Sequence, residues 1–290
     1  MFDLVQDFLE LTARRCPDKI ALHCEGRQFT YRELDEQANQ LANALIESGV
    51  KRGDRVALML GNTAEMVISI FAVLKAGAVF VSIHEGTRSS RLHQILSSAR
   101  PAALIARHSL VAPDEMAAVL ADTASLKTLI LARRDPAAGP TDPASVLDWA
   151  EIQGDQPASR PTRTIIDLDL ACLIYTSGST GVPKGVMCDH SNMIFVSGSI
   201  VQYLENNEDD RILSVLSLAY SYGLYQLLAT FRTGATLILE ASFAFPVLIL
   251  QAMAERQVTG FAGTPTIFAI LLQRDISRYE IGRASCRERV

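Results

Sequence analysis

Residues 175–185 read YTSGSTGVPKG and constrain this chain more than any other stretch. Eleven positions hold three glycines, five hydroxyl-bearing residues and one lysine, directly after the apolar run at 170–174. Glycine lets the backbone turn tightly so that several N–H groups face an anion, while Ser, Thr and Lys add further donors and positive charge. The stretch therefore predicts a loop that binds a polyphosphate.

Two other interpretations of this loop are weaker. A flexible Gly/Ser linker seldom ends in a fixed Pro-Lys-Gly between a strand and a helix. The Walker loop has the pattern GxxxxGK[ST], in which glycine directly precedes lysine and Ser or Thr follows it. Here Pro183 precedes Lys184 and Gly185 follows it, so the Walker spacing is not met.

The loop resembles the signature [ST]-G-[ST]-T-G-x-P-K-G of the adenylate-forming (AMP-binding) superfamily. This superfamily contains acyl-CoA synthetases, aryl-CoA ligases, luciferases and the adenylation domains of peptide synthetases. The resemblance also includes TYREL at 30–34, LKAGA at 74–78 and GTPT at 263–266. By this resemblance the chain is identified as acyl-CoA synthetase-like and as an N-terminal fragment of such an enzyme.

The resemblance implies a reaction and its cofactors. In the superfamily the loop holds the β- and γ-phosphates of ATP, bound with Mg²⁺, while a substrate carboxylate attacks the α-phosphate. The acyl group then passes from acyl-AMP to the thiol of CoA or to the phosphopantetheine of an acyl carrier protein. Lys184 is the candidate catalytic residue, because its charge would offset the repulsion between carboxylate and triphosphate. The candidate ATP-binding residues are Thr176, Ser177, Gly178, Ser179, Thr180, Gly181 and Lys184.

Two further segments resemble parts of the acid pocket in this superfamily. They are LAYSYGL at 218–224 and GTP at 263–265, and the candidate substrate-binding residues are Tyr220, Gly263 and Thr264. Core packing explains Tyr220 almost equally well, and a strand-to-helix turn also explains Gly263 and Thr264.

The segment 218–224 also indicates which class of acid is the substrate. Relatives that activate amino acids usually carry Asp there to pair with the substrate ammonium, and residues 218–224 contain none. We therefore expect a fatty or other non-amino acid as substrate. The alternative enzyme is a peptide-synthetase adenylation domain, and the alternative of another class is a non-catalytic nucleotide-binding fragment.

Histidines give no sign of a metal site. His190 and Asn192 follow the loop, where relatives often show His-x-Asn opening a helix, and helix capping and loop support are the expected roles. The other four histidines lie far apart without metal-ligand spacing, so no zinc site is predicted: His23, His84, His93 and His108.

Strand and helix patterns alternate along the chain, which predicts an α/β fold with parallel sheets. Thr30 and Glu33 form a capping-box pattern before a helix that Gly49 closes. By resemblance we expect two stacked doubly wound sub-domains, those of the large N-terminal domain of AMP-forming ligases, truncated. The expected boundaries are 1–132 for the first sub-domain, 133–163 for a linker or surface excursion, and 164–279 for the second, which carries the phosphate loop.

Residues 280–290 read EIGRASCRERV and match the translation of a common short-read sequencing adapter codon by codon. We interpret this segment as an artefact that is no part of the natural fold. The expectation is that the natural product continues beyond residue 279, and that the 290-residue chain alone forms no thioester.

Composition narrows the class further. The formal net charge is −5 and no run of Lys or Arg occurs, which argues against nucleic acid as a partner. The five cysteines show no CxxC spacing, which favours reduced thiols in the cytoplasm. The N-terminus lacks the basic region of a signal peptide, and Lys75 and Gly77 interrupt the apolar stretch 66–83, so no transmembrane segment is predicted.

Overall fold

A computed structural model describes residues 2–111, 114–133, 145–176 and 183–279. The chain forms two compact units. Unit 1 comprises Met1–Gln6, Asp35–Gly61 and Glu65–Ile194, and unit 2 comprises Asp7–Leu34, Asn62–Ala64 and Phe195–Val290, each within the described residues.

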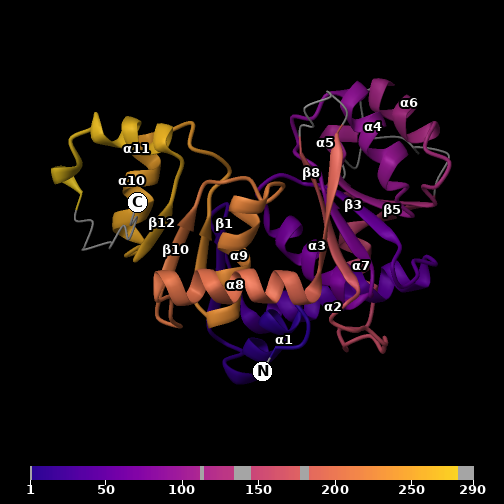
Figure 1. Cartoon of the computed structure of the whole chain (residues 1–290), viewed down its shortest axis with the longest axis horizontal. Coiled ribbons are helices and arrows are strands. Elements are labelled where there is room, and N and C mark those ends of the chain that lie inside the picture. Colours follow the sequence, from indigo (N-terminus) through magenta and orange to yellow (C-terminus); the bar gives the residue numbers. More distant parts are fainter. Residues whose placement is uncertain (1, 112–113, 134–144, 177–182, 280–290) are drawn as a thin grey trace. The chain divides into compact units, whose positions relative to one another are not determined.

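Unit 1 is built on a seven-stranded sheet with the order β7-β6-β5-β3-β4-β8-β9 in the described part of the chain. Figure 1 labels its strands β3, β5 and β8. The pairings are parallel except for the antiparallel pair of β8 and β9. The strands are β3 (Arg55–Met59), β4 (Val79–Ser82), β5 (Ala103–Arg107), β6 (Thr128–Ala132), β7 (Ser145–Asp148), β8 (Leu170–Thr176) and β9 (Lys184–Asp189). Central strands such as β4 are buried along their whole length, as expected for a parallel sheet covered on both faces.

The helices of unit 1 bury apolar side chains against this sheet. They are α2 (Tyr31–Glu47), α3 (Ala64–Lys75), α4 (Ser89–Ala99), α5 (His108–Val111), α6 (Asp114–Ala121) and α7 (Trp149–Asp155), of which α2 and α3 begin in unit 2. One face of the sheet packs Met59 and Leu104 against Leu92 and Leu96 of α4. The buried Lys75 ammonium of α3 lies 2.6 Å from Asp35 Oδ1 of α2, so the charge buried at the end of α3 is paired.

Unit 2 is built on a five-stranded sheet with the order β12-β10-β11-β1-β2 among the described residues. The strands are β1 (Ile20–Cys24), β2 (Arg27–Thr30), β10 (Arg211–Ser214), β11 (Thr236–Leu239) and β12 (Gly260–Ala262). The helical elements are α1 (Asp7–Arg15), α8 (His190–Leu204, which begins in unit 1), α9 (Ser221–Thr233), α10 (Pro246–Glu255), α11 (Pro265–Leu272) and the 3₁₀ turn η1 (Ile276–Arg278).

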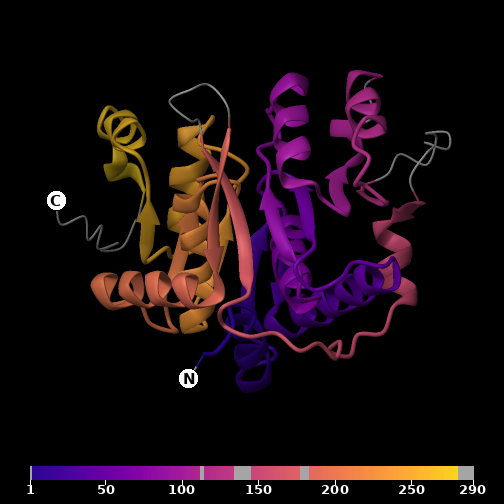
Figure 2. The same ribbon diagram turned by 45° about the vertical axis from the view of Figure 1, so that its right-hand side comes forward.

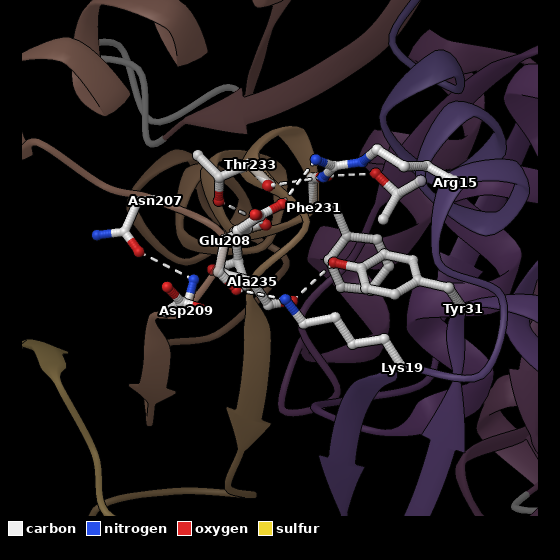
Figure 3. Close-up of polar contacts among 11 residues, drawn as sticks. Arg15, Lys19, Tyr31, Asn207, Glu208, Asp209, Phe231, Thr233 and Ala235 are labelled. Atoms are coloured by element: carbon white, nitrogen blue, oxygen red, sulfur yellow. Dashed lines mark hydrogen bonds and ion pairs between the residues drawn. The ribbon is translucent and has the colours of Figure 1, made fainter.

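Within unit 2 the first strands of the chain join strands from its last third. β1 pairs in parallel with β11, so that Leu22 lies opposite Leu237. The buried Tyr31 hydroxyl donates to Ala235 O at 2.6 Å, and its ring meets that of Phe231 edge-on, with the centroids 5.4 Å apart (Figure 3). Burial raises the pKa of Tyr31, so this phenol stays protonated and remains a donor.

The units do not follow the boundaries expected at 132/133 and 163/164. β8 pairs with β4, so the strand that leads into the predicted phosphate loop belongs to unit 1. The N-terminal hairpin of β1 and β2 belongs to unit 2. Residues 145–148 of the expected linker form β7, which extends the sheet beside β6, while 134–144 lie outside the described residues. Hydrogen-bond pairing across long sequence separations decides this grouping.

Predictions that rest on short sequence patterns agree better with the structure than the sub-domain boundaries do. The capping box is formed, because Thr30 N donates to Glu33 Oε2 at 2.7 Å and Glu33 N donates to Thr30 Oγ1 at 3.2 Å. Gly49 has φ of 93°, a left-handed conformation that favours glycine after a helix end. The apolar stretch 66–83 divides into α3 and β4, and none of the described helices is long and apolar enough to cross a membrane.

Candidate functional site

In the sequence, β8 and β9 flank the predicted phosphate loop, and the two strands form an antiparallel hairpin, seen as the long salmon-coloured pair in Figure 2. Thr176 ends β8, Lys184 begins β9, and the two residues lie opposite each other in the register. Both are exposed, so a hydroxyl and an ammonium stand together where the two strands meet the loop. The candidates Ser177, Gly178, Ser179, Thr180 and Gly181 lie outside the described residues.

Gly185 has a packing role that the loop pattern did not reveal. It lies opposite Tyr175, and a Cβ at this position would be 3.1 Å from Tyr175 Cζ. The Tyr175 hydroxyl lies 3.0 Å from Ser98 Oγ of α4 and donates to it. The buried Tyr175 ring therefore occupies the space beside Gly185, which accounts for the last glycine of the motif without any ligand contact.

The chain turns from β9 into α8 through a side-chain cap. Asp189 Oδ1 accepts hydrogen bonds from the backbone N–H of Asn192 at 2.7 Å and from Ser191 Oγ at 2.8 Å. These two bonds hold the pKa of the Asp189 carboxyl below its usual value. His190 is buried, and its Nδ1 accepts a hydrogen bond from Val5 N at 3.1 Å. Asp189, which we did not single out from the sequence, is thus the helix cap, and an Asp directly before a helix pattern was the available signal.

We expect Asp189→Ala to lower the free energy of unfolding by about 1 kcal/mol at pH 7, the usual value of an N-cap side chain. Because the folded-state pKa is depressed, the ionised carboxylate stabilises the fold above its unfolded pKa of about 3.9. The difference between wild type and variant should therefore persist from pH 7 down to about 4 and narrow as the pH falls further, through the lower folded-state pKa, in urea titrations. A difference that stays constant with pH would contradict the role of the ionised carboxylate, and Asp189→Asn serves as the uncharged capping control.

Unit 2 contains a cavity of about 880 Å³ beside β10 and β12. Side chains of α8, α9 and the segment after β12 surround it, and several of them are aromatic. The lining includes Phe195, Tyr222, Tyr225, Phe261, Gly263 and Phe268. Gly263 directly follows the carboxyl end of β12, which is the end at which ligands bind in open parallel sheets.

Of the three candidate substrate-binding residues, one lines this cavity and two do not. Gly263 lines it, and its carbonyl accepts a hydrogen bond of 3.4 Å from the Tyr222 hydroxyl. Tyr220 is not among the lining residues; it is the N-cap of α9 and 52% exposed. Thr264 is the N-cap of α11 and is likewise absent from the lining. Because α9 begins at Ser221, Tyr222 and Tyr225 share the face that borders the cavity, and a helix-phase argument could have selected them.

Two carboxylates line the cavity at its other end. Asp210 precedes β10 and accepts hydrogen bonds from Thr259 Oγ1 at 2.8 Å and from Asn207 N at 2.9 Å. The second is Glu205. Neither lies in the 218–224 segment, and no carboxylate from that segment occurs in the lining that the structure describes.

With this geometry in place, the class of protein can be assigned. Residues 9–285 match the model of the AMP-binding enzyme family, and the chain belongs to that family. The match ends inside 280–290, the segment that we interpreted as an adapter and that lies outside the described residues. The predicted family is thereby confirmed, and the two largely parallel sheets with their helices confirm the predicted α/β fold class.

Curated relatives include large peptide synthetases. Phosphinothricin tripeptide synthetase PhsC of Streptomyces viridochromogenes is 37% identical over 235 residues, which make up 80% of this chain and 19% of the relative. A dimodular nonribosomal peptide synthase of Bacillus subtilis is 30% identical over 92% of this chain and 11% of its own length. This chain therefore spans only a small part of these proteins.

Solved structures give a second view of the same family. An anthranilate CoA ligase, AuaEII, in complex with anthranoyl-AMP superposes with a TM-score of 0.88 at 26% identity and covers 96% of this chain and 53% of its own. VinN in complex with L-aspartate has a TM-score of 0.78 at 26% identity, over 95% of this chain and 65% of its own.

Proposed function

We propose that this chain is the ATP-binding part of an enzyme that activates a carboxylic acid as acyl-AMP with release of pyrophosphate. The acyl group then passes to a thiol of CoA or of a carrier-protein phosphopantetheine. Membership in the AMP-binding enzyme family is the observation that carries this proposal. The exposed pair of Thr176 and Lys184 at the two ends of the loop supports it, because a hydroxyl and an ammonium are fitting donors for phosphate oxygens.

The roles proposed for the residues follow from charge. ATP would bind along the hairpin end, with Lys184 offsetting the negative charge that a carboxylate meets as it approaches the triphosphate. Mg²⁺ binds in such sites largely through substrate phosphates, and we propose that it arrives with ATP. Catalysis would then consist mainly of positioning the two reactants and stabilising phosphate charge.

For the acid we propose a fatty, aryl or other non-amino acid. The cavity of unit 2 presents aromatic side chains near Gly263, where the Tyr222 hydroxyl and the Gly263 carbonyl meet. The 218–224 segment offers no carboxylate at this end of the cavity. An unpaired ammonium buried there would be strongly disfavoured, whereas an alkyl or aryl group would suit the lining.

A second candidate is the activation of an amino acid by an adenylation domain of a peptide synthetase. The observation that favours it is the set of curated relatives, which are peptide synthetases at up to 37% identity over 80% of this chain. The carrier-protein acceptor would then be favoured over free CoA.

The two candidates differ in a substrate screen. Acid-dependent ATP–pyrophosphate exchange should be measured with the product of the whole reading frame, against fatty acids, aryl acids and amino acids. We expect fatty or aryl acids to support the faster exchange. A clear preference for an amino acid would establish the second candidate, and a folded protein that binds ATP but exchanges with no acid would favour a non-catalytic nucleotide-binding protein.

A matched variant sharpens this screen. Ser221 lines the cavity at the start of α9, so Ser221→Asp places a carboxylate in the lining. We expect the variant to lose rate with fatty acids and to gain relative rate with amino acids. An unchanged order of substrates would mean that the acid does not occupy this end of the cavity.

A further inference from the structure

Two cysteine side chains meet across the hairpin that carries the phosphate loop. Cys172 of β8 lies directly opposite Cys188 of β9 in the antiparallel register. Both residues are buried, but Cys172 is fully buried and Cys188 is 9% exposed, so Cys188 lies closer to the surface. The Cys172 thiol also lies 3.7 Å from Met193 Sδ of α8. Neither thiol has a role in the proposed reaction.

The backbone geometry suits a covalent link between these residues. Residues directly opposite each other in an antiparallel pair have Cα atoms about 4.5 or 5.5 Å apart, depending on the hydrogen-bonding pattern. Disulfides span Cα separations of roughly 4.4–6.8 Å, so both values fall inside the permitted range. Side chains directly opposite each other point to the same face of the hairpin, so the two sulfur atoms lie on one side of it.

The two thiols differ in their acidity. Hydrogen bonding from Cys172 lowers the pKa of Cys188 below the ordinary value of a thiol, which favours the thiolate form of the less deeply buried residue. The same interaction, together with burial, raises the pKa of Cys172 and keeps this thiol protonated. The arrangement is that of a reactive cysteine next to a resolving one.

We propose that Cys172 and Cys188 form a reversible oxidation site, which peroxide converts to an intramolecular disulfide. The Cys188 thiolate attacks one oxygen of hydrogen peroxide, and the O–O bond breaks to give a sulfenic acid and hydroxide, which takes up a proton to become water. The Cys172 thiol then gives its proton to the sulfenic oxygen while its sulfur attacks the Cys188 sulfur, so that an S–S bond forms, the S–O bond breaks and the oxygen leaves as a second water. Two thiols are thus oxidised and one peroxide is reduced to two waters.

The disulfide would act on the end of the hairpin that holds Lys184. Side chains alternate along a strand, so the cysteine pair, the pair of Ile174 and Val186, and the pair of Thr176 and Lys184 share one face. β9 is the edge strand of the described sheet and hydrogen-bonds only to β8 there. A covalent link would therefore restrict the movement of Lys184 relative to Thr176. The effect on catalysis, though not the disulfide itself, rests on the proposed function.

The test begins with the reduced 290-residue chain, which is exposed to equimolar hydrogen peroxide, alkylated after denaturation, digested and analysed by mass spectrometry. We expect the loss of two alkylatable thiols, one cross-linked peptide pair containing Cys172 and Cys188, and full recovery with dithiothreitol. The triple variant Cys16→Ser, Cys24→Ser and Cys286→Ser should behave identically, whereas Cys188→Ser should form no cross-link. Amide exchange of residues 184–189 should slow upon oxidation in the triple variant.

Several outcomes would overturn the proposal. They are retention of both thiols, over-oxidation of Cys188 without a cross-link, or a dominant disulfide to one of the other cysteines. Exchange assays before and after oxidation of the whole protein test the oxidation site and the proposed function separately. A mapped disulfide in a protein that never catalyses exchange would contradict the proposed function alone, and active enzyme without a disulfide would contradict the oxidation site alone.

Discussion

Lys184→Ala is expected to slow acid-dependent ATP–pyrophosphate exchange by about 10²–10³-fold in the protein from the whole reading frame. The physical reason is the loss of one preorganised donor to developing charge, which typically costs about 2.7–4 kcal/mol in the transition state. Lys184 is exposed at the first position of β9, so its removal leaves no cavity and no buried partner without a hydrogen bond. Circular dichroism and urea midpoints should match those of wild type.

Two controls make this result specific. Lys127 is another exposed lysine of unit 1, directly before β6, and Lys127→Ala should leave exchange unchanged. Lys184→Arg keeps the charge while changing its shape, so it should retain part of the activity. Exchange at the wild-type rate in Lys184→Ala would remove this residue from the phosphate site, while the family membership would stand.

Gly223→Ala is expected to lower the free energy of unfolding of unit 2 by about 3 kcal/mol, the upper end of the usual cost of overpacking. Gly223 is buried in the first turn of α9, and a Cβ there would lie 2.3 Å from Ser217 O and 2.7 Å from Leu216 O. These atoms belong to the backbone and cannot move aside by changing a rotamer. Relief requires α9 to shift, which would also displace Tyr222 in the cavity lining.

Urea denaturation followed by fluorescence measures this effect, with Gly154→Ala as the matched control. Gly154 lies in α7, and a Cβ there would meet no atom within 4 Å. Alanine in a helix is favoured over glycine by roughly 0.5–1 kcal/mol, so the control should be neutral or slightly stabilising. Equal stability of Gly223→Ala and wild type would contradict the close approach of α9 to residues 216–217.

Local features of this fold were predictable because their causes lie within a few residues. The reciprocal hydrogen bonds of Thr30 and Glu33, the left-handed Gly49 and the strand-to-helix turn at Gly263 and Thr264 all appear where the sequence placed them. Caps and turn residues act through contacts between near neighbours, so a short stretch of sequence is enough to predict them.

The pairing of the strands could not be predicted from such short stretches of sequence. Leu22 lies opposite Leu237, and Phe80 lies opposite Cys172, across separations that local patterns do not encode. A parallel strand that is buried on both faces has much the same apolar composition wherever it sits in a sheet. The expected sub-domain boundaries consequently divided the sequence in order, whereas the units interleave segments from both ends of the chain.

The cavity of unit 2, which we propose to bind the acid, shows how helix phase decides which residues line a cavity. From the sequence we selected Tyr220, which is exposed as the N-cap, while Tyr222 borders the cavity two residues later. A shift of two residues rotates a side chain by about 200° around a helix of 3.6 residues per turn. The start of α9 at Ser221 fixes that rotation.

By itself the sequence determined the family and the chemistry of the loop, because a run of Gly, Ser, Thr and Lys has its donors whatever surrounds it. Tertiary structure alone decided what those residues face. It placed Lys184 opposite Thr176, the Tyr175 ring against Gly185, and Cys172 opposite Cys188. The physical reason is register: in a hairpin with a side-chain period of two, a slip of one residue would move every one of these side chains to the other face.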